Sequence, residues 1–416
     1  MKKITCKAIA LDLTPIEVAR NLSHLDGMIF FDSSGNLSKN DSLPLSIIAA
    51  RPLKILKGEK CEFEKLKQEM SHYELDHTCD EYQSFPLGGA FGWLDYDGGY
   101  CFGIYDSCLI YSHNDKQWYE VGELVEEMLE VNLLAFEANE FISHTEKSDY
   151  ILGVEKAKNY ISSGDIYQVN LAQKFSAKVK SGDLFSLYDS LRNVAPAPMS
   201  AYFKLLDYEV LSSSPETFLK MSHKDIETRP IKGTRPRYNE QILDEASARE
   251  LLDSTKERAE LVMITDLERN DLGKVCEFGS VKVDEMLQLE KLEHVYHLVS
   301  KVSGTLREGI DHWDAIAECF PGGSITGAPK KRAMEIIAEL ENEDRGLYTG
   351  AVGYVGFNEV SQFNIVIRTL IREGLDLHYH VGAGIVADSE AEAEYEETIQ
   401  KAKGIRSAIE RSLNAS

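Results

Sequence analysis

The hydrophobic and polar positions of the first 150 residues form short runs typical of strands, with few long helical stretches. A capping box at Thr14–Glu17, with proline at the first helical position, predicts a short helix that ends at about Leu25. A turn is expected at Asp32–Gly35, where polar residues and glycine interrupt the apolar pattern. Three apolar or glycine-rich runs predict buried strands: Gly27–Phe31, Ser46–Ala50 and Gly88–Trp93.

Residues after about 150 mix helical and strand patterns without the strict alternation of a βαβ barrel, which predicts the α+β class. A short polar segment at 143–148 suggests a boundary between an N-terminal region, 1–145, and a second region, 148–410. Helical periodicity predicts helices at Tyr150–Ser162, Lys256–Glu268 and Glu390–Leu413. Strands are predicted at Ile166–Ala172, Ala201–Leu205, Gly350–Phe357, Phe363–Ile371 and Leu377–His380.

The amino-acid composition argues against two classes of binding partner. The 416 residues carry 69 Asp and Glu against 45 Lys and Arg, a formal net charge of −24. Nucleic acids and anionic membranes are attracted by positive fields, so neither is expected as a partner. The seven cysteines are scattered without a C-x-x-C pair, which favours reduced thiols over a disulfide framework. No apolar run resembles a signal peptide or a membrane span, so a cytoplasmic location is expected.

Two predicted helices each carry a pair of glutamates three residues apart. Glu257 and Glu260 share one helix face, and Glu394 and Glu397 share a face of the last helix. Two such faces could converge on one divalent cation, and an oxygen-only ligand set suits Mg²⁺. The alternative is two solvated acidic faces in a strongly acidic chain, and spacing alone does not exclude it.

A basic segment, PIKGTRPR at 230–237, stands out in this acidic chain. Its two prolines and glycine predict an irregular loop that gathers Lys232, Arg235 and Arg237. Lysine becomes a nucleophile when its amine loses the proton, which desolvation or a nearby cation favours. The alternative is a surface loop whose cations pair with acidic side chains.

The glycine-rich segment at 321–330 precedes a predicted helix at Lys330–Glu341 and could present backbone N–H groups to an anion. It is not a Walker loop, because G-x-x-x-x-G-K-[ST] is absent. The other interpretation is a tight turn before a helix. A second glycine pair, Gly382 and Gly384, follows a predicted strand and could let a ligand approach the backbone.

Three single residues complete the candidate chemistry. Arg368 lies in an apolar predicted strand and needs an anionic partner from the protein or a ligand. Glu216, after Ser212-Ser213-Ser214-Pro215, could be a general acid or a charge at a helix N-terminus. His297 lies in an apolar strand, where a hydrogen-bonded core histidine is the simpler interpretation.

Together these motifs resemble the chorismate-utilising enzymes, which include anthranilate synthase component I, aminodeoxychorismate synthase component I and the isochorismate and salicylate synthases. The resembling segments run in order over about residues 150–408; the N-terminal part resembles them more loosely, in SIIAARP and FPLGGAFGWLDYD. The segments are SGDIYQVNLAQKF, SSSPETF, RPIKGTRPR, KERAELVMITDLERNDLGKV, VYHLVSKVSGTL, FPGGSITGAPKKRAMEII, YTGAVGYVGF, FNIVIRTL and GAGIVADSEAEAEYEET.

The resemblance implies an anthranilate synthase component I-like fold, with large sandwich-type sheets flanked by helices, and a Mg²⁺-dependent chorismate site. By matching position, Glu260 and Glu397 would ligate Mg²⁺, with Glu257 and Glu394 beside it or bound through water. Glu216 would be the general acid/base, and His297 would lie near the C4 hydroxyl. The residues implied to hold or surround chorismate are Arg368, Tyr348, Gly382, Gly384, Lys401 and Thr326.

Two positions choose the branch within the family. Water-using members resemble Y-x-K-V, whereas this chain has Tyr167-Gln168-Val169 and lacks that lysine. Anthranilate synthases usually have P-I-A-G-T where this chain has Lys232, the mark of aminodeoxychorismate synthase. The resemblance therefore implies 4-amino-4-deoxychorismate formation through a covalent Lys232 intermediate, for para-aminobenzoate and folate synthesis. The alternative is anthranilate synthase component I.

The chain lacks a G-x-C-x-G type nucleophile motif, so a separate glutamine amidotransferase subunit is expected to supply ammonia. A non-catalytic, metal-binding homologue is the other class of protein that we considered. The presence together of five residues with implied catalytic or binding roles argues against it: Glu216, Lys232, Glu260, Glu397 and Arg368.

Overall fold

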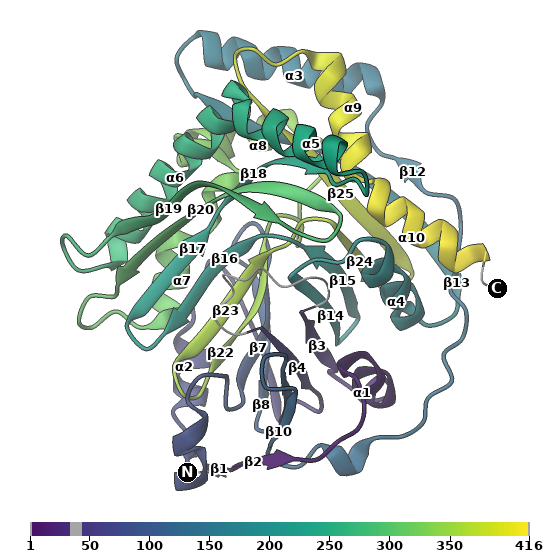
Figure 1. Cartoon of the computed structure of the whole chain (residues 1–416), viewed down its shortest axis with the longest axis vertical. Helices are drawn as coiled ribbons and strands as arrows, with labels where there is room; N and C mark the ends of the chain where they lie inside the picture. The colour runs from purple at the N-terminus through teal and green to yellow at the C-terminus, as the bar shows by residue number, and fades with distance from the viewer. Residues whose placement is uncertain (1, 34–43, 415–416) are drawn as a thin grey trace.

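The computed structural model describes residues 2–33 and 44–414, which fold into two large antiparallel sheets with helices on their outer faces (Figure 1). The 13-stranded sheet has the order β11-β13-β25-β24-β15-β14-β3-β4-β9-β10-β2, with β12 and β21 also paired to β13. The 10-stranded sheet has the order β18-β20-β17-β16-β23-β22-β7-β8-β5, with β19 also paired to β20. A two-stranded parallel pair, β1 and β6, stands apart.

The strands of the 13-stranded sheet are β2 Cys6–Ile9, β3 Ile29–Asp32, β4 Leu45–Ala49, β9 Cys108–Ser112, β10 Gln117–Val121, β11 Glu137–Ala138, β12 Ile142–Ser143, β13 Gln168–Ser181, β14 Met199–Leu205, β15 Tyr208–Ser214, β21 Gly327–Ala328, β24 Thr369–Glu373 and β25 Asp376–Ile385. Those of the 10-stranded sheet are β5 Lys54–Gly58, β7 Gly89–Leu94, β8 Tyr100–Tyr105, β16 Thr217–Ser222, β17 Asp225–Arg229, β18 Ile231–Pro236, β19 Lys282–Lys291, β20 Val295–Thr305, β22 Ala351–Gly356 and β23 Val360–Ile365. The separate pair is β1 Lys2–Ile4 and β6 Tyr73–Leu75.

The α-helices are α1 Pro15–Leu22, α2 Glu64–Met70, α3 Lys147–Ser162, α4 Leu184–Val194, α5 Gln241–Asp253, α6 Thr255–Val275, α7 His312–Cys319, α8 Lys330–Leu340, α9 Ala391–Lys401 and α10 Lys403–Asn414. In Figure 1, α3, α8 and α9 gather at the top, and α4 and α10 lie together on the right. No described helix combines the length and the apolar character needed to cross a membrane.

The hydrophobic core is layered, as expected for a sandwich. One cluster lies between the two sheets and joins side chains such as Phe203 of β14 to Phe91 and Tyr354 of β7 and β22. A second cluster packs α1, α4 and α10 onto the 13-stranded sheet. A third packs α2, α6 and α7 onto the 10-stranded sheet. The predicted class, α+β with large sandwich-type sheets flanked by helices, is confirmed.

Each large sheet combines a block of strands from before residue 145 with an adjacent block of strands from after it. β3 pairs with β14, and β7 pairs with β22, so the core between the sheets is built by both regions. The helix predicted from the capping box is present as α1, and the capping box is formed: Thr14 N donates to Glu17 Oε2 at 2.8 Å. The division into 1–145 and 148–410 stays a prediction.

Three of the sequence expectations about elements are wrong. The helix expected over Glu390–Leu413 breaks at Ala402 into α9 and α10. The strand expected over Phe363–Ile371 is two strands, because Arg368 between them has a left-handed φ of 51°. The basic segment expected as a loop is β18, with a register shift between Lys232 and Thr234 where Gly233 has φ 71°. The turn expected at Asp32–Gly35 lies partly outside the described residues, which resume at residue 44.

The chain passes from one large sheet to the other at two adjacent points, between β15 and β16 and between β23 and β24. β15 belongs to the 13-stranded sheet and β16 to the 10-stranded sheet; β24 and β23 are related in the same way. The crossing segments contain Glu216 and Arg368, and their backbones are hydrogen-bonded: Ile365 N donates to Glu216 O at 3.1 Å and Ser213 N to Arg368 O at 3.2 Å. This crossing point is where most of the candidate residues gather.

Candidate active site

Glu216 and Arg368 face each other across the two crossing segments. Burial raises the pKa of Glu216, while Ser324, Lys232 and Arg368 oppose that shift. Burial lowers the pKa of Arg368, and Glu216 opposes that shift. A buried carboxyl of raised pKa is a candidate for a general acid.

Lys232 lies beside this pair and reaches toward the metal-site glutamates. Its charge is among those that lower the pKa of Glu216, Glu260 and Glu397, so its ammonium stands within electrostatic reach of all three. Its Nζ lies 3.7 Å from the point that a Cβ on Gly384 would occupy. Lys232 therefore lies close to Glu216, Glu260 and Glu397, and its catalytic role stays a prediction.

The other two cations of the basic segment are paired with acids on α5 and α6. Arg235 pairs with Glu250 at 2.8 Å and with Glu257, one of the predicted metal-site glutamates, at 3.6 Å. Arg237 pairs with Asp244 at 3.3 Å. The expectation that three cations gather is wrong for Arg237, which is held on α5, whereas Lys232 and Arg235 both reach the glutamates of the site.

His297 on β20 completes this side of the site. Its Nδ1 lies 3.0 Å from Thr234 Oγ1 and 3.3 Å from Gly233 O. The carbonyl can only accept, so Nδ1 carries the hydrogen in that contact and Nε2 is an acceptor. Nε2 is buried without a hydrogen-bond partner among the described residues. Burial and Arg368 lower the pKa of His297 to about 3, so the ring is neutral at physiological pH.

A glycine-lined cradle forms the opposite wall. Gly382 and Gly384 on β25 pair with Ala172 and Asn170 on β13. A Cβ on Gly382 would lie 2.9 Å from the hydroxyl of Tyr348, and a Cβ on Gly384 would lie 2.6 Å from the amide nitrogen of Gln168. These glycines therefore keep the space open where side chains from β13 and the Tyr348 segment meet.

Lys401 and Thr326 border the cradle in different ways. Lys401, at the end of α9, donates to Gly382 O at 2.9 Å and pairs with Glu397 at 2.8 Å. Thr326 is fully buried, and its hydroxyl donates back to Gly322 O and Gly323 O. Thr326 therefore shapes the glycine-rich turn through its own backbone contacts, while Lys401 places a positive charge at the rim.

The four glutamates predicted to hold Mg²⁺ lie on α6 and α9, which face each other. Burial raises the pKa of Glu260, and the like charges of Glu257 and Glu397 add to the effect, while Lys232 and Lys256 oppose it. For Glu397, burial is outweighed by Lys401, Lys256 and Lys232, which lower its pKa. These carboxylates are close enough to sense one another's charge.

The donor set fits an oxygen-seeking cation, although the described side chains form no ready cluster of three or more metal-binding groups. Glu394 is 3% exposed; Lys256 at 3.2 Å and the Ser389 hydroxyl at 2.6 Å both engage its Oε1. Its Oε2 is buried without a hydrogen-bond partner among the described residues. A buried, unsatisfied carboxylate oxygen close to the buried Glu260 and the more exposed Glu257 and Glu397 suits the chemistry of Mg²⁺.

The sequence interpretation missed a second buried acidic group on α6. Glu268 accepts from Gly323 N at 3.0 Å, and Asp271 pairs with Lys274 at 2.7 Å and Lys330 at 2.5 Å. Burial, followed by the like charge of Asp271, raises the pKa of Glu268 to about 7. The available signal was spacing, since 260, 264, 268 and 271 continue one helix face.

The sequence interpretation also missed Arg345, which contacts the segments that form the glycine-lined cradle. Its buried guanidinium pairs with Glu341 at 2.7 Å and donates to Asn170 O at 2.8 Å and Ile325 O at 3.0 Å. It also lies 5.8 Å from the ring centroid of Tyr348. Arg345 therefore ties β13, the glycine-rich turn and the Tyr348 segment together.

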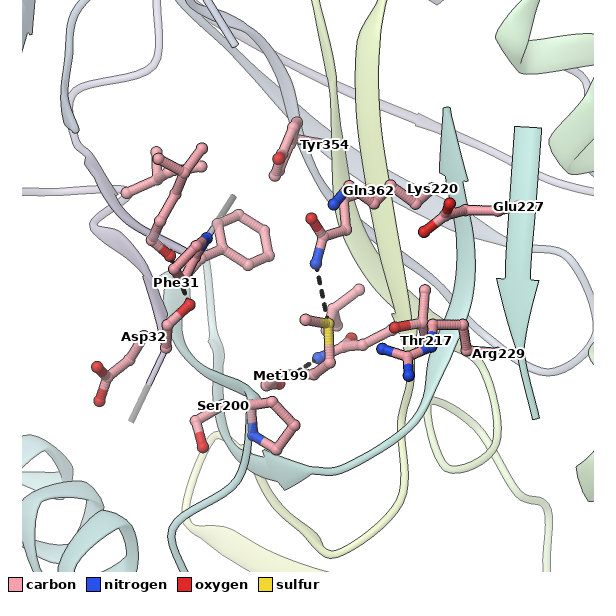
Figure 2. A pocket seen from close by; sticks show the side chains of 17 residues that line it. Phe31, Asp32, Met199, Ser200, Thr217, Lys220, Glu227, Arg229, Tyr354 and Gln362 are labelled. Atoms are coloured by element: carbon pink, nitrogen blue, oxygen red, sulfur yellow. Dashed lines mark hydrogen bonds between the residues drawn. The ribbon is translucent and has the colours of Figure 1, made fainter. Parts of the chain in front are cut away.

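Figure 2 shows a separate cavity that contains none of the predicted site residues. It opens between β3 and β14 of one sheet and β16, β17, β22 and β23 of the other, with Phe31, Met199 and Tyr354 on its walls. Gln362 Nε2 donates to Met199 Sδ at 2.9 Å across it. Thr217, next to Glu216, lines this cavity, so the two spaces lie on opposite sides of one crossing segment.

The comparison with protein families gives one match, to the chorismate binding enzymes, over residues 49–407. Aminodeoxychorismate synthase component 1 of Bacillus subtilis is 39% identical over 377 residues, covering 81% of this chain and 79% of the relative. Anthranilate synthase component 1 of Synechocystis sp. is 47% identical over 279 residues, 65% of this chain and 55% of the relative. The chain spans little more than half of the anthranilate synthase relatives.

Solved structures give the same fold. Anthranilate synthase component I of Streptococcus pneumoniae superposes with a TM-score of 0.75 at 28% identity, covering 96% of this chain and 99% of the other. The menaquinone-specific isochorismate synthase MenF of Escherichia coli superposes with a TM-score of 0.79 at 16% identity, covering 98% and 94%. The latter likeness concerns the fold alone.

Proposed function

Because the chain belongs to the family of chorismate binding enzymes, we propose that this chorismate-utilising enzyme makes 4-amino-4-deoxychorismate from chorismate and ammonia. The observation that carries the proposal is Lys232. This amine is placed among Glu216, Glu260 and Glu397 and next to Gly384. Arg368 lies within electrostatic reach of Glu216 and of His297, whose Nε2 has no hydrogen-bond partner among the described residues.

Substrate binding follows from the charges around the pocket. Chorismate is a dianion, and Arg368 and Lys401 provide two positive groups for its carboxylates. Gly382 and Gly384 leave room for the ring against the backbone of β25. Glu260 and Glu397, with Glu257 and Glu394 beside them, would hold Mg²⁺, which when bound supplies positive charge for the ring carboxylate.

In the first chemical step the Lys232 ammonium gives its proton to solvent, its neutral amine forms a bond to C2, the ring double bonds shift, and the C4–O bond breaks. The protonated Glu216 gives its proton to the departing hydroxyl, which leaves as water. His297, a neutral ring with an acceptor nitrogen, orients the C4 hydroxyl. Dividing one difficult displacement into two steps is the usual advantage of a covalent intermediate.

In the second step ammonia bonds to C4, the double bonds shift back, and the C2–N bond to Lys232 breaks. The proton lost by the new ammonium group returns to the Glu216 carboxylate, so the donor is ready for another turnover. The overall change is chorismate plus ammonia to 4-amino-4-deoxychorismate plus water. We propose that ammonia comes from a glutamine amidotransferase subunit, in line with the name component 1 of the Bacillus relative.

The test is the product of Lys232→Ala with chorismate, Mg²⁺ and ammonium. Wild type is expected to release 4-amino-4-deoxychorismate, and mass spectrometry without ammonia should find an adduct on the peptide that carries Lys232. The variant is expected to bind chorismate but to lose most of this product, because the nucleophile is gone. Lys224→Ala, an exposed lysine, is the control. Wild-type rates in Lys232→Ala would contradict the covalent mechanism.

The second candidate function is anthranilate synthesis. The observation in its favour is that anthranilate synthases are 43–47% identical to this chain over about two thirds of its length. That reaction places ammonia at C2, the carbon that Lys232 attacks in our mechanism, so the two functions predict different products from one assay. Anthranilate as the only product of the wild-type chain would replace our proposal with this one.

A further inference from the structure

Glu268 lies close to Glu216, the proposed proton donor, with the glycine-rich turn between the two side chains. Its carboxylate accepts from Gly323 N at 3.0 Å, and it is 4% exposed. The next residue, Ser324, approaches Glu216 from the same turn and lowers the pKa of that carboxyl. The Ser324 hydroxyl is buried and makes no hydrogen bond of regular geometry with any described residue. One turn of the glycine-rich segment therefore separates two buried carboxyls.

The turn has little freedom to move away from Glu268. A Cβ on Gly323 would lie 2.6 Å from the side chain of Leu267 and 3.0 Å from Glu268 Oε1, so the backbone is packed directly onto α6. Thr326 closes the turn by donating to Gly322 O and Gly323 O. The Glu268 contact therefore fixes where Ser324 stands relative to Glu216.

We propose that Glu268 is a positioning residue for Glu216: it holds the Gly323–Ser324 turn against the proton donor and shares one buried electrostatic environment with it. The proposal rests on the proposed function in that Glu216 is the proton donor there. Glu268 itself touches no reacting atom, because the turn stands between it and the pocket.

The charged surroundings of Glu268 make this pairing sensitive to protonation. Asp271 on the same helix and Glu216 across the turn repel its negative charge, Lys330 from α8 attracts it, and the Cys319 thiol at the end of α7 lies nearby. Burial, with the like charges of Asp271 and Glu216, raises its pKa to about 7, and Lys330 and the Gly323 N–H oppose the shift. Two interacting carboxyls titrate as a pair, so removing one charge must lower the pKa of the other.

The direct test is infrared titration of the full-length, metal-free chain, following the carbonyl band of protonated carboxylic acids. Glu268→Gln is expected to delete a component that titrates near pH 7. Glu216→Gln is expected to keep that component and move its midpoint to lower pH, because one of the like charges around Glu268 is gone. Glu277→Gln, an exposed glutamate after α6, is the matched control and leaves the midpoint in place. An unmoved midpoint in Glu216→Gln would overturn the proposal.

Turnover gives a second, independent measurement. Activity needs protonated Glu216, and loss of the Glu268 charge lowers the pKa of Glu216. The alkaline limb of kcat/KM in Glu268→Gln is therefore expected to move to lower pH, with chorismate binding kept because glutamine still accepts from Gly323. Glu268→Ala, which lacks the acceptor, should also raise KM. A profile that superimposes on wild type would refute the role, whereas anthranilate as product would refute only the proposed function.

Discussion

The two ends of α6 treat the charges of their buried acids differently. At the C-terminal end Asp271 has a lysine on each oxygen and Glu268 accepts from Gly323 N, although the like charge of Asp271 still raises the pKa of Glu268. At the N-terminal end Glu260 lies among further glutamates, and Glu394 of α9 keeps one buried oxygen without a hydrogen-bond partner among the described residues. The same acidic pattern on one helix thus forms a closed structural cluster at one end and an open ligand site at the other.

The difference follows from which elements pack against each end. The C-terminal half meets α7, α8 and the glycine-rich turn. Besides its ion pair with Asp271, the Lys330 ammonium donates hydrogen bonds to Cys319 O at 2.9 Å and Pro321 O at 2.7 Å. The first turn of the N-terminal half meets α9, another acidic helix, through the Lys256–Glu394 ion pair. A buried acid is a candidate ligand when the fold leaves its charge unmatched, and a structural group when the fold matches it.

The contrast between the two ends of α6 would fail if the glutamates at the N-terminal end needed no cation for activity. Glu260→Gln and Glu397→Gln are each expected to lower kcat/KM by about a thousandfold, because a lost carboxylate leaves the metal and substrate carboxylate poorly held. Calorimetry should show weakened Mg²⁺ binding while circular dichroism stays unchanged. Glu392→Gln, an exposed glutamate on α9, is the control. Full activity of either variant in EDTA would contradict the metal site.

At the closed end the expected loss is of stability. Asp271→Asn removes the charge that two lysines share and leaves Lys330, whose side chain is 15% exposed, without its counter-charge. Urea unfolding should show a destabilisation of about 3 kcal/mol. The control is Asp266→Asn on the exposed face, whose partner Arg269 is also exposed, and it should cost less than about 0.5 kcal/mol. Equal effects of the two changes would mean that burial does not distinguish them.

Glu268 provides a further test of the C-terminal end of α6, because its protonation makes the stability of the fold depend on pH. Its pKa is about 7 in the folded chain and near the ordinary 4.5 in the unfolded chain, so the folded state binds the extra proton between these values. Stability should therefore fall as pH rises through this window, by roughly 1 kcal/mol per pH unit from this group. Glu268→Gln should show a flatter profile in denaturant titrations at several pH values, and an unchanged slope would contradict the raised pKa.

The smallest expected effect concerns the start of α6. The Ser254 hydroxyl accepts from Glu257 N at 3.3 Å and caps the helix. Ser254→Ala should reduce the free energy of unfolding by about 1 kcal/mol, and Ser254→Asn should restore most of it. Both can be read from thermal unfolding. A loss of Mg²⁺ binding in Ser254→Ala without loss of stability would show that the cap serves the open site more than the helix.

Sequence patterns predicted those parts of the molecule in which local chemistry decides structure. The capping box that starts α1 and the face shared by Glu257 and Glu260 are local, and both are present. The candidate site residues were chosen by chemistry and resemblance, and Glu216, Lys232, His297 and Arg368 lie together at the crossing of the sheets.

What sequence could not predict depends on contacts between distant segments. Phe363–Ile371 has the apolar pattern of one strand, and only the pairing of its halves with different sheets places the left-handed Arg368 between them. Arg237 could not be separated from Lys232 before the position of α5 was known. The roles of Glu268, Lys330 and Arg345 likewise appear only when α6, α8 and β13 are brought together.

The paired crossings of β15–β16 and β23–β24 also bear on how the chain acquires activity. Each crossing is held by hydrogen bonds to the other, and the strands it joins belong to sheets built from both halves of the sequence. Contacts between residues about 150 positions apart carry a large loop-closure entropy and form late in folding. Neither half of the chain can therefore complete its folding before the other. During refolding, enzyme activity should be regained in the same cooperative phase in which both sheets are completed.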